Sequence, residues 1–403
     1  MSTSRAIRSA ALALAAFSTC LIARPANANA ITTLASFDDT NGAYPSGEVT
    51  VLGDNIYGTT SQGGASKVGT VFSVPLGGGS VTTLATFHGS DGALPYAGLT
   101  VVQNRLFGTT SEGGTSGVGT LFSVPLTGGS ISTVLSFDTA NGAKPSAGLR
   151  LRDGQLYGTT EVGGDQGCGT VFSIPVTGGR LTTLASLKNR DGPSFPLSRP
   201  LIVGNTLYAT SGKAGFTENG AVFSVPITGG APTIVGLFNW SNGDSPRADV
   251  TASGDTLYAA GFWGGSWGDG TIVSIPLAGG SPTVLARFIR GYTGTNPRGG
   301  LVVSGNVLYG TTEYGGAYGY GEVFALPIGG GPLTVLGSFD WTNGAYPTST
   351  LTLVGNTLYG TTAYGGQNSV GTVFAITIPE PTNAFALTGL SFAVLRRLRR
   401  TRA

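Results

Sequence analysis

Short apolar segments, separated by turns rich in glycine, asparagine and proline, run through most of the chain. Within these segments apolar residues stand side by side, as in Leu156-Tyr157 and Val171-Phe172. A strand with one solvated face would instead alternate apolar and polar residues. Adjacent apolar residues are typical of sheets that are covered on both faces. The pattern therefore predicts a β protein whose sheets stack face to face.

The segment "LYGTT" and its variants recur along the chain. Its aromatic residue stands at intervals of 50 or 51 residues, at Tyr57, Phe107, Tyr157, Tyr208, Tyr258, Tyr309 and Tyr359. Repeats of this length are typical of propellers and solenoids. One copy divides at its turns into four predicted strands, at residues 99–102, 105–110, 119–124 and 131–137. Four antiparallel strands and a longer connection, here residues 138–147, make one propeller blade.

The two ends of this repeat array are out of phase. The seventh copy ends after its third strand, "GTVFAI" at 371–376, and a lone fourth strand, "ITTLASF" at 31–37, precedes the first copy. A solenoid would instead need distinct caps at both ends. We therefore predict an all-β, seven-bladed β-propeller of four-stranded blades over residues 31–378. The N-terminal strand completes the last blade, which leaves no open sheet edge.

The motifs "LYGTTxxGG" and "GTVFxVPL" resemble those of the GloVer (Gloeo/Verruco) tandem-repeat family over the whole repeat body. The period and the aromatic of the second strand loosely resemble kelch propellers. The GloVer resemblance implies a frequent association with PEP-CTERM tails and implies no established activity. Blades 4 and 5 depart from the motif, with "LYATSGKAGF" and "LYAAGFWGG", so we do not expect seven equivalent sites.

Residues 1–30 have the three zones of a secretory signal peptide. A basic start is followed by an apolar run and by small residues at Ala28 and Ala30 that fit an A-x-A cleavage pattern. We expect signal peptidase to remove this segment. Cys20 lies inside the apolar run without the usual lipobox neighbours, so a lipoprotein is the weaker alternative.

Residues 379–403 have the order of a sorting signal. Pro379-Glu380-Pro381 precede an apolar run at 384–395 and then a basic cluster made of Arg396, Arg397, Arg399 and Arg400. The run is shorter than the roughly 20 residues of an ordinary spanning helix, and the arginines favour a cytoplasmic C-terminus. The segment resembles the PEP-CTERM signal. That resemblance implies transient membrane insertion, cleavage by an exosortase-type protease, and release or attachment at the cell surface, often beside exopolysaccharide production. A plain C-terminal membrane anchor is the alternative.

Charge argues against a nucleic-acid partner. The two ends hold eight of the 22 basic residues and one of the 20 acidic residues, so the body has 14 basic and 19 acidic residues and a net charge of −5. Cys168 is alone in the body, so no internal disulfide is expected. Three other blades have valine at its position, which predicts a small buried residue and not a nucleophile.

Aromatic residues gather in the loops after the second predicted strand of blades 5, 6 and 7. The candidates for ligand binding are Phe262, Trp263, Trp267, Tyr314, Tyr318, Tyr320 and Tyr364. Loops of neighbouring blades share one face of the disc, where exposed rings can stack on sugars or anchor a protein partner. Filling of space between the loops is the alternative.

Each of these loops ends in a glycine, for which we expect a positive φ or a close backbone approach. These residues are Gly69, Gly119, Gly169, Gly220, Gly270, Gly321 and Gly371. The connections between blades repeat a polar residue three positions before Asn-Gly or Asp-Gly, as in Asp38 with Asn41 and His88 with Asp91. Asx-type turns explain this pattern without a metal ion.

Neither a catalytic site, a metal site nor a cofactor is expected from the residue types. His88 is the only histidine and falls in a predicted turn. Glu161 and Glu313 share a loop position, yet their blades lie across the disc from each other, beyond the roughly 5–10 Å that paired glycosidase carboxylates need.

We therefore expect an exported, surface-sorted, non-catalytic propeller that binds or organises extracellular polysaccharide or surface proteins. An enzyme that acts on polysaccharide, such as a lyase, hydrolase or lactonase, is one alternative, and a purely structural matrix protein is another.

Overall fold

The structure is a computed structural model that describes residues 30–188, 192–214 and 218–378. The predicted signal peptide, apart from Ala30, and the predicted sorting tail with Pro379, Glu380, Pro381 and its arginines lie outside the described residues. In the described part the chain forms 31 strands. That part contains no helix of the length and apolar character that crossing a membrane requires.

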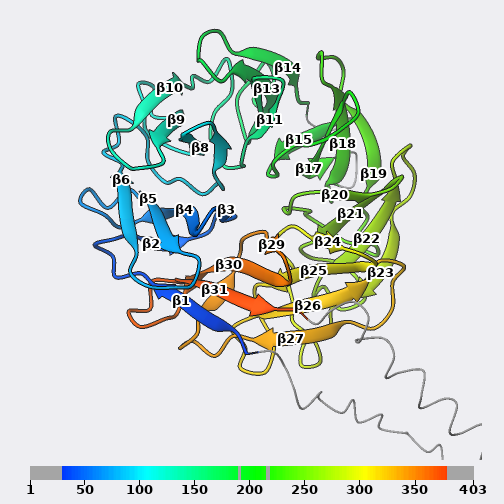
Figure 1. Ribbon diagram of the computed structural model, residues 1–403. Helices are drawn as coiled ribbons and strands as arrows, with labels where there is room; N and C mark the ends of the chain where they lie inside the picture. The colour runs from blue at the N-terminus through cyan, green and yellow to red at the C-terminus, as the bar shows by residue number, and fades with distance from the viewer. Residues whose placement is uncertain (1–29, 189–191, 215–217, 379–403) are drawn as a thin grey trace, which may run out of the picture.

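The strands form seven antiparallel sheets, which stand as blades around a central axis (Figure 1). We number the blades in chain order. From the inside outward, the first three blades consist of β3 (Thr50–Leu52), β4 (Asn55–Gln62), β5 (Thr70–Pro75) and β6 (Thr82–Thr86); β7 (Thr100–Val102), β8 (Arg105–Thr110), β9 (Thr120–Pro125) and β10 (Ser132–Ser136); and β11 (Arg150–Arg152), β12 (Gln155–Thr160), β13 (Thr170–Pro175) and β14 (Thr182–Ser186).

The next three blades have the same order. They consist of β16 (Leu201–Val203), β17 (Thr206–Ala214), β18 (Ala221–Pro226) and β19 (Thr233–Leu237); β20 (Thr251–Ser253), β21 (Thr256–Gly261), β22 (Thr271–Pro276) and β23 (Thr283–Arg287); and β24 (Val302–Ser304), β25 (Val307–Thr312), β26 (Glu322–Pro327) and β27 (Thr334–Ser338). The all-β, seven-bladed propeller predicted from the sequence is thus confirmed.

Blade 7 is built from both ends of the described chain. Its strands are β29 (Thr352–Val354), β30 (Thr357–Tyr364), β31 (Thr372–Thr377) and, outermost, β1 (Thr32–Ser36). β1 is antiparallel to β31, with Thr32 opposite Ala375 and Ser36 opposite Thr372. Figure 1 shows the blue N-terminal strand beside the red last strand. The predicted closure of the ring is confirmed.

The connections between blades contain short strands that the sequence did not predict. β2 (Ala43–Pro45), β15 (Pro193–Pro196) and β28 (Ala345–Pro347) pair with the far ends of β4, β17 and β30. In the other four blades an isolated β-bridge replaces the short strand, for example between Ala93 and Glu112. Each connection is therefore held against the second strand of the blade that it enters.

The alternating strand directions give the disc two different faces. The loops after the second strands and the connections between blades lie at one face, which we call the loop face. The two-residue turns between the first and second strands, and the turns between the third and fourth strands, lie at the opposite face, the turn face.

Phenylalanines fill the spaces between blades. Twelve of them are less than 2% exposed: Phe37, Phe72, Phe87, Phe122, Phe137, Phe172, Phe223, Phe238, Phe288, Phe324, Phe339 and Phe374. Five pairs of these rings make edge contacts across a blade boundary, such as Phe87 after β6 against Phe122 of β9, with centroids 4.9 Å apart. An edge contact of this kind contributes roughly 0.5–1.5 kcal/mol beyond the burial of apolar area.

The glycine that ends each loop packs against the proline that begins the next blade. A Cβ at any of the seven glycines would lie 2.5–2.7 Å from the Cδ atom of that proline. The pairs are Gly69 with Pro95, Gly119 with Pro145, Gly169 with Pro196, Gly220 with Pro246, Gly270 with Pro297, Gly321 with Pro347, and Gly371 with Pro45. All seven glycines have φ between +86° and +109°. The positive φ and the close approach expected from the sequence are both confirmed.

A hydrogen bond accompanies each Gly–Pro contact. The residue before the proline donates its N–H to the carbonyl of the residue before the glycine, over 2.8–3.0 Å, as from Leu94 to Val68 and from Phe195 to Cys168. These seven donors are left-handed, with φ of 48–60°, although none is a glycine: Tyr44, Leu94, Lys144, Phe195, Ser245, Asn296 and Tyr346. A left-handed conformation costs such residues roughly 1–2 kcal/mol, so the contacts at the boundary must offset it.

The predicted Asx-type turns and the predicted burial of the lone cysteine are confirmed. Asn41 donates its N–H to Asp38 Oδ1 over 2.9 Å, and His88 donates its N–H to Asp91 Oδ1 over 2.8 Å, as in Asx-type turns. The Cys168 side chain is buried in the apolar core between blades 3 and 4.

Glu322 interrupts a repeated pair of hydroxyl groups. In four blades the second threonine of the Thr-Thr element pairs with a threonine of the third strand, as Thr60 pairs with Thr70 over 2.8 Å. In blade 6, Thr312 instead faces Glu322, which is 1% exposed and accepts the N–H of Gly294 at 2.6 Å. Burial raises the pKa of this carboxyl to about 7.

The Gly–Pro contact can be tested by comparing two glycines of one loop. Gly117 also has a positive φ, but a Cβ there would meet open space, whereas a Cβ at Gly119 would meet Pro145 and the carbonyl of Thr110. We expect Gly117→Ala to cost roughly 1–2 kcal/mol in the free energy of unfolding. We expect Gly119→Ala to cost about 3 kcal/mol or more, because overpacking adds to the backbone strain. Urea denaturation measures both values, and equal losses would mean that the boundary contact contributes nothing.

Glu322 predicts a specific dependence of stability on pH. Its pKa in the folded protein, about 7, lies above the ordinary value of 4.5. Between these values the unfolded chain releases a proton that the folded protein retains, so stability decreases as pH rises from about 4.5 to about 7, by up to roughly 3 kcal/mol. Glu322→Thr introduces the residue that five other blades have at this position. The variant should lack this part of the decrease when urea denaturation is repeated across the pH range. If the difference in the free energy of unfolding between parent and variant stayed constant from pH 4 to pH 7, the raised pKa of Glu322 would be refuted.

Candidate functional site

The segments that lead into the innermost strands enclose a cavity on the axis of the propeller. It has a volume of about 450 Å³ and draws residues from all seven blades. The residue directly after each boundary proline lines it: Ser46, Tyr96, Ser146, Leu197, Arg247, Arg298 and Thr348. Glu112, Lys144 and Glu161 also line it and belong to the loop face, so the cavity opens on that face. Its volume lies within the roughly 300–1,000 Å³ of small-molecule sites.

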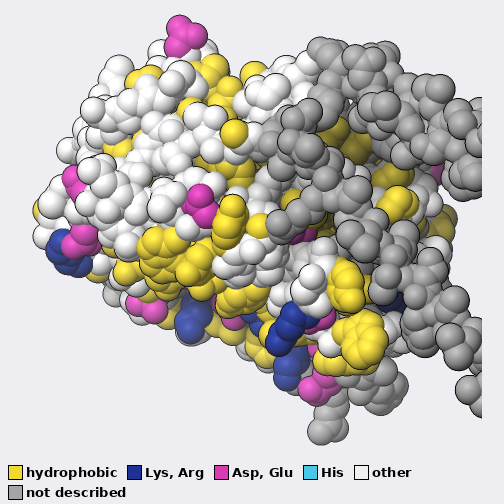
Figure 2. Space-filling view, turned by 90° about the horizontal axis from the view of Figure 1, so that it is seen from below, with side chains coloured by type: hydrophobic (Ala, Val, Ile, Leu, Met, Phe, Trp, Pro, Cys, Tyr) yellow, Lys and Arg dark blue, Asp and Glu magenta, His cyan; other side chains and the backbone are white. Residues whose placement is uncertain are grey.

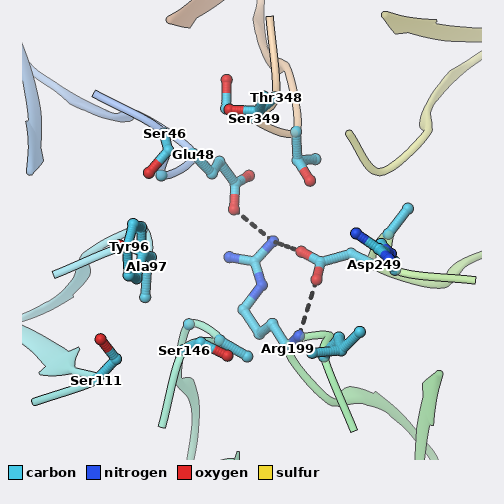
Figure 3. Close-up of a pocket in the computed structure, with 18 of the residues that line it drawn as sticks. Ser46, Glu48, Tyr96, Ala97, Ser111, Ser146, Arg199, Asp249, Thr348 and Ser349 are labelled. Carbon is cyan, nitrogen blue, oxygen red and sulfur yellow. Dashed lines mark hydrogen bonds and ion pairs between the residues drawn. The ribbon is translucent and has the colours of Figure 1, made fainter. Parts of the chain in front are cut away.

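An ion pair network crosses the axis at the inner end of this cavity. Arg199 of blade 4 places Nη2 2.6 Å from Oε2 of Glu48 in blade 1 and 3.4 Å from Oδ2 of Asp249 in blade 5. The backbone N–H of Arg199 also donates to Oδ1 of Asp249 over 2.8 Å. Figure 3 shows the three side chains meeting between opposite walls. Each side chain is only 17–21% exposed, and burial raises the pKa of Glu48 while Arg199 opposes that increase.

Small residues make room for this network. Glu48, Arg199 and Asp249 all stand three positions after a boundary proline, and three other blades have glycine there. A Cβ at Gly148 would lie 3.2 Å from Cδ of Arg199, and one at Gly98 would lie 3.1 Å from Cβ of Glu48. The glycines thus let the long side chain of Arg199 cross the axis.

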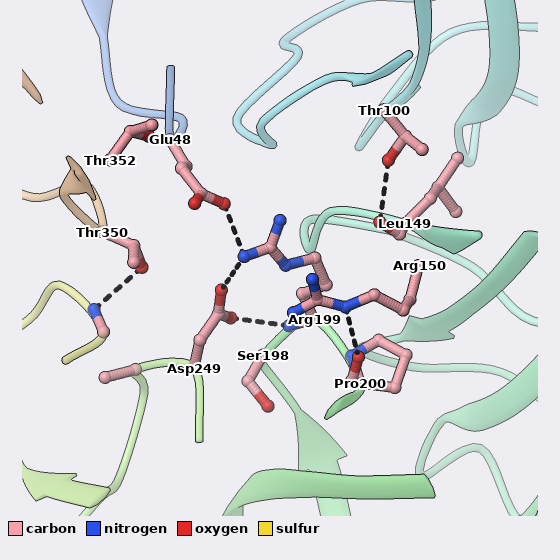
Figure 4. Close-up of polar contacts among 12 residues, drawn as sticks. Glu48, Thr100, Leu149, Arg150, Ser198, Arg199, Pro200, Asp249, Thr350 and Thr352 are labelled. Carbon is pink, nitrogen blue, oxygen red and sulfur yellow. Dashed lines mark hydrogen bonds and ion pairs between the residues drawn. The ribbon is translucent and has the colours of Figure 1, made fainter. Parts of the chain in front are cut away.

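A second layer of polar residues lies beyond the network, toward the turn face. Arg150 donates from Nε to the carbonyl of Pro200 over 3.3 Å, and Thr100 donates its hydroxyl to the carbonyl of Leu149 over 2.8 Å (Figure 4). Burial, and after it the neighbouring Arg199, lower the pKa of Arg150. These contacts join neighbouring blades around the axis.

The mouth of the cavity is lined by charged residues of both signs. Arg298 places Nη1 3.3 Å from Oε2 of Glu313. Arg247 stacks on the ring of Phe262, 4.8 Å from its centroid. Partial burial, and then Arg298 of the same cavity lining, lower the pKa of Arg247. Glu112 and Glu161 form no ion pair among the described residues.

Two of the predicted aromatic residues form one contact beside this mouth. Phe262 and Trp263 make an edge contact with centroids 4.9 Å apart. Trp263 is 39% exposed, whereas Phe262 is buried, because its ring lies beneath Arg247. Phe262 therefore supports the cavity wall and is not available for stacking on a ligand.

Three more of the predicted residues belong to a continuous cluster of rings over blades 6, 7 and 1. Tyr346 lies at its centre and contacts Tyr314 at 5.3 Å, Tyr364 at 5.7 Å and Tyr320 at 5.9 Å between centroids. The cluster continues from Tyr364 to Tyr44 and from Tyr320 to Trp341. We call these six rings the tyrosine cluster. Tyr314 directly follows Glu313, the partner of Arg298, so the cluster lies next to the mouth of the cavity. Burial, and then Glu313, raise the pKa of Tyr314.

The remaining predicted residues, Trp267 and Tyr318, project from the loop face. They are 73% and 63% exposed and make no ring contact among the described residues. In the edge-on view of Figure 2, hydrophobic side chains gather in patches on the visible surface with charged side chains beside them.

The cavity was not predicted from the sequence. Glu48, Arg199, Asp249, Arg247 and Arg298 were all missed, although a signal was present. Charged residues make up only 10% of the chain, yet these five follow boundary prolines in the segments that lead into the innermost strands. Tyr44 and Tyr346 were missed because neither lies in the loops after the second strands.

Comparisons with known proteins agree with the repeat and the fold. A family model described as the Gloeobacter/Verrucomicrobia repeat matches residues 21–212 and again residues 196–392. A search of curated proteins finds no match.

Solved structures of a similar fold include three bacterial proteins. One is TolB of Acinetobacter baumannii, with 12% identity over 66% of this chain and 58% of that chain and a TM-score of 0.42. Another is a puromycin-hydrolysing peptidase of Mycobacterium tuberculosis, with 15% identity over 84% of this chain and 52% of that chain and a TM-score of 0.54. The third is the extracellular domain of a B. thetaiotaomicron protein assigned to the one-component systems, with 11% identity over 86% of this chain and 40% of that chain and a TM-score of 0.57. This chain covers only 40–58% of those chains. The likeness to the two structures with TM-scores above 0.5 shows the fold alone.

Removal of Arg199 tests the network at the inner end of the cavity. Arg199→Met leaves two carboxylates facing each other without a cation, so we expect a loss of about 1–3 kcal/mol in the free energy of unfolding, below the cost of a fully buried pair because the groups are partly solvated. The triple variant Glu48→Gln, Arg199→Met and Asp249→Asn should recover most of that loss, because no unpaired charge remains. Chemical denaturation distinguishes the two variants. If Arg199→Met were as stable as the parent, the network would not hold the opposite walls together.

Proposed function

This chain belongs to the Gloeobacter/Verrucomicrobia repeat family, and on that premise we propose that it is an exported, surface-sorted, non-catalytic propeller that binds an extracellular polysaccharide on its loop face. The single observation that carries the proposal is the exposure of aromatic rings there. Five rings of blades 5, 6 and 7 are 39–73% exposed, namely Trp263, Trp267, Tyr314, Tyr318 and Tyr364. The same protein buries twelve phenylalanines almost completely, so packing alone does not account for rings left in solvent.

The chemistry around these rings favours a sugar ligand. A sugar ring offers an apolar face for stacking and a rim of hydroxyl groups for hydrogen bonds. The exposed tyrosines and tryptophans combine an apolar ring with a polar group in the same way. Carboxylates and guanidinium groups of the cavity mouth lie beside them and can bond to hydroxyl groups. Neighbouring blades present several rings, which suits a polymer with repeated units.

The arrangement of acidic groups supports a non-catalytic role. Arg199 engages Glu48 and Asp249, and Arg298 engages Glu313. His88 lies on an exposed connection between blades, where it contacts Asp91. Three carboxyl groups at the cavity and its mouth are thus held by arginines, whereas Glu112 and Glu161 form no ion pair among the described residues.

The predicted ends of the chain support an extracellular location. The signal peptide at 1–30 and the PEP-CTERM-like tail at 379–403 would bring the propeller to the cell surface. Tails of this kind often accompany exopolysaccharide production, which agrees with a polysaccharide ligand.

The proposal predicts which surface a polysaccharide contacts. We expect the purified protein to migrate more slowly in native gels that contain its polysaccharide ligand. The screen covers neutral and acidic polysaccharides. Trp263→Ala, Trp267→Ala and Tyr314→Ala combined should weaken binding at least about tenfold, because a stacked ring contributes roughly 0.5–1.5 kcal/mol. The matched control combines Leu52→Ala, Leu151→Ala and Val354→Ala, which remove hydrophobic side chains that are 37–41% exposed toward the turn face. It should bind as the parent does.

Other outcomes of this screen would refute the proposal. Binding that survives the loop-face variant would refute the site. Turnover of a polysaccharide would favour the enzyme instead. Capture of a surface protein and of no polysaccharide, or no binding at all, would favour a protein-binding or structural role.

A further inference from the structure

Side-chain atoms without hydrogen-bond partners concentrate at the central cavity. Among the described residues four buried side-chain nitrogen or oxygen atoms have no partner, and three of them line the cavity: Ser46 Oγ, Arg199 Nε and Thr348 Oγ1. Buried polar groups are paired in the large majority of cases. Figure 3 shows Ser46, Thr348 and Arg199 around the same space. None of the three atoms is open to solvent, so the hydroxyl groups of Ser46 and Thr348 reach a ligand of this cavity only after a change of side-chain rotamer.

The mouth adds two cations from neighbouring blades. Arg247 and Arg298 follow the boundary prolines of neighbouring blades 5 and 6, and both are exposed to the cavity. Arg298 is paired with Glu313, but Arg247 makes no ion pair with a carboxylate among the described residues. A carboxylate placed between two guanidinium groups forms strong, charge-assisted hydrogen bonds with both.

The acidic residues of the wall restrict the kind of anion. Glu112 and Glu161 line the same cavity from blades 2 and 3. They would repel a phosphate monoester, which bears about −1.5 to −2 charges at neutral pH, more strongly than a carboxylate with a single charge, whereas they can accept hydrogen bonds from sugar hydroxyl groups. Tyr96, 40% exposed, also lines the cavity and offers a ring face for stacking.

We propose that the central cavity binds a hexuronate unit of an acidic polysaccharide, with its carboxylate between Arg247 and Arg298 and its hydroxyl groups bonded to Ser46, Thr348, Glu112 and Glu161. This inference rests on the proposed polysaccharide binding at the loop face and defines the charge of the sugar. The aromatic rings of blades 5 to 7 then hold neighbouring units of the same polymer.

A pair of ligands that differ only in charge tests the inference. Oligogalacturonate and its methyl-esterified form have the same sugar rings, so their affinities for the purified full-length protein isolate the contribution of the carboxylates. By isothermal titration we expect the acid to bind at least tenfold more tightly than the ester. Arg247→Gln combined with Arg298→Gln should abolish that preference. Arg180→Gln, which removes an exposed cation near the turn face, should leave it unchanged.

A second variant avoids any loss of folding that removal of the arginines causes. Ser46→Ala combined with Thr348→Ala deletes two hydroxyl groups that have no partner in the protein, so stability should remain near that of the parent. We expect a three- to tenfold loss of affinity for the acid.

The possible results separate this inference from the proposed function. If acid and ester bind equally, and only the aromatic variant loses binding, the hexuronate site is overturned while polysaccharide binding stands. If Arg180→Gln weakens the preference as much as the arginine pair does, the attraction is nonspecific and the site is overturned. If neither these ligands nor any other polysaccharide binds, the proposed function and this inference both fail.

Discussion

The contact between a glycine and a proline at every blade boundary is the constraint on which the rest of the structure depends. The glycine must have a positive φ and no side chain, because the proline of the next blade occupies the space of a Cβ. The residue before that proline must be left-handed to donate its N–H across the boundary. Seven such boundaries close a ring only when the last one, between Gly371 and Pro45, also forms. That boundary joins blade 1 to a blade 7 completed by β1, so the N-terminal strand is part of the closure.

The same contact positions the candidate site. Residues directly after the boundary prolines line the cavity, and residues of the loops before the boundary glycines provide the exposed rings. Two sets of variable residues are therefore attached to one rigid frame. Arg247 and Arg298 can replace the serines of other blades without disturbing the boundary, and Trp263 can stand where other blades have Gln62 or Glu112. This separation explains how seven similar blades can present one asymmetric site.

The fold could be predicted from the sequence because its signals are local and repeated. The period, the phase of "ITTLASF" and the invariant glycines each follow from neighbours along the chain. The left-handed residues could not be predicted, because their side chains range from Lys144 to Phe195 and a residue before proline is ordinarily extended. The pairing of Arg199 with Glu48 joins residues 151 positions apart across the axis, and no local pattern encodes such a pair.

The placement of the predicted aromatic residues could be predicted in part for a related reason. The loop positions identified which face holds Trp263, Trp267 and Tyr314, since that depends on strand order alone. Whether a ring is exposed depends on its neighbours in space. Phe262 is covered by Arg247, and Tyr320 is half-buried against Trp341 and Tyr346.

The central claim is that a polysaccharide binds over the axial cavity and the rings beside it. Hydrogen–deuterium exchange of the protein, with and without a bound acidic oligosaccharide, tests this most directly. The account predicts slower exchange with ligand on the loop face, over residues 44–48, 94–98, 245–249, 262–267, 296–298 and 313–320. It predicts no change over the turns at 52–55, 152–155 and 354–357. Protection at those turns, or protection spread evenly over all blades, would contradict it.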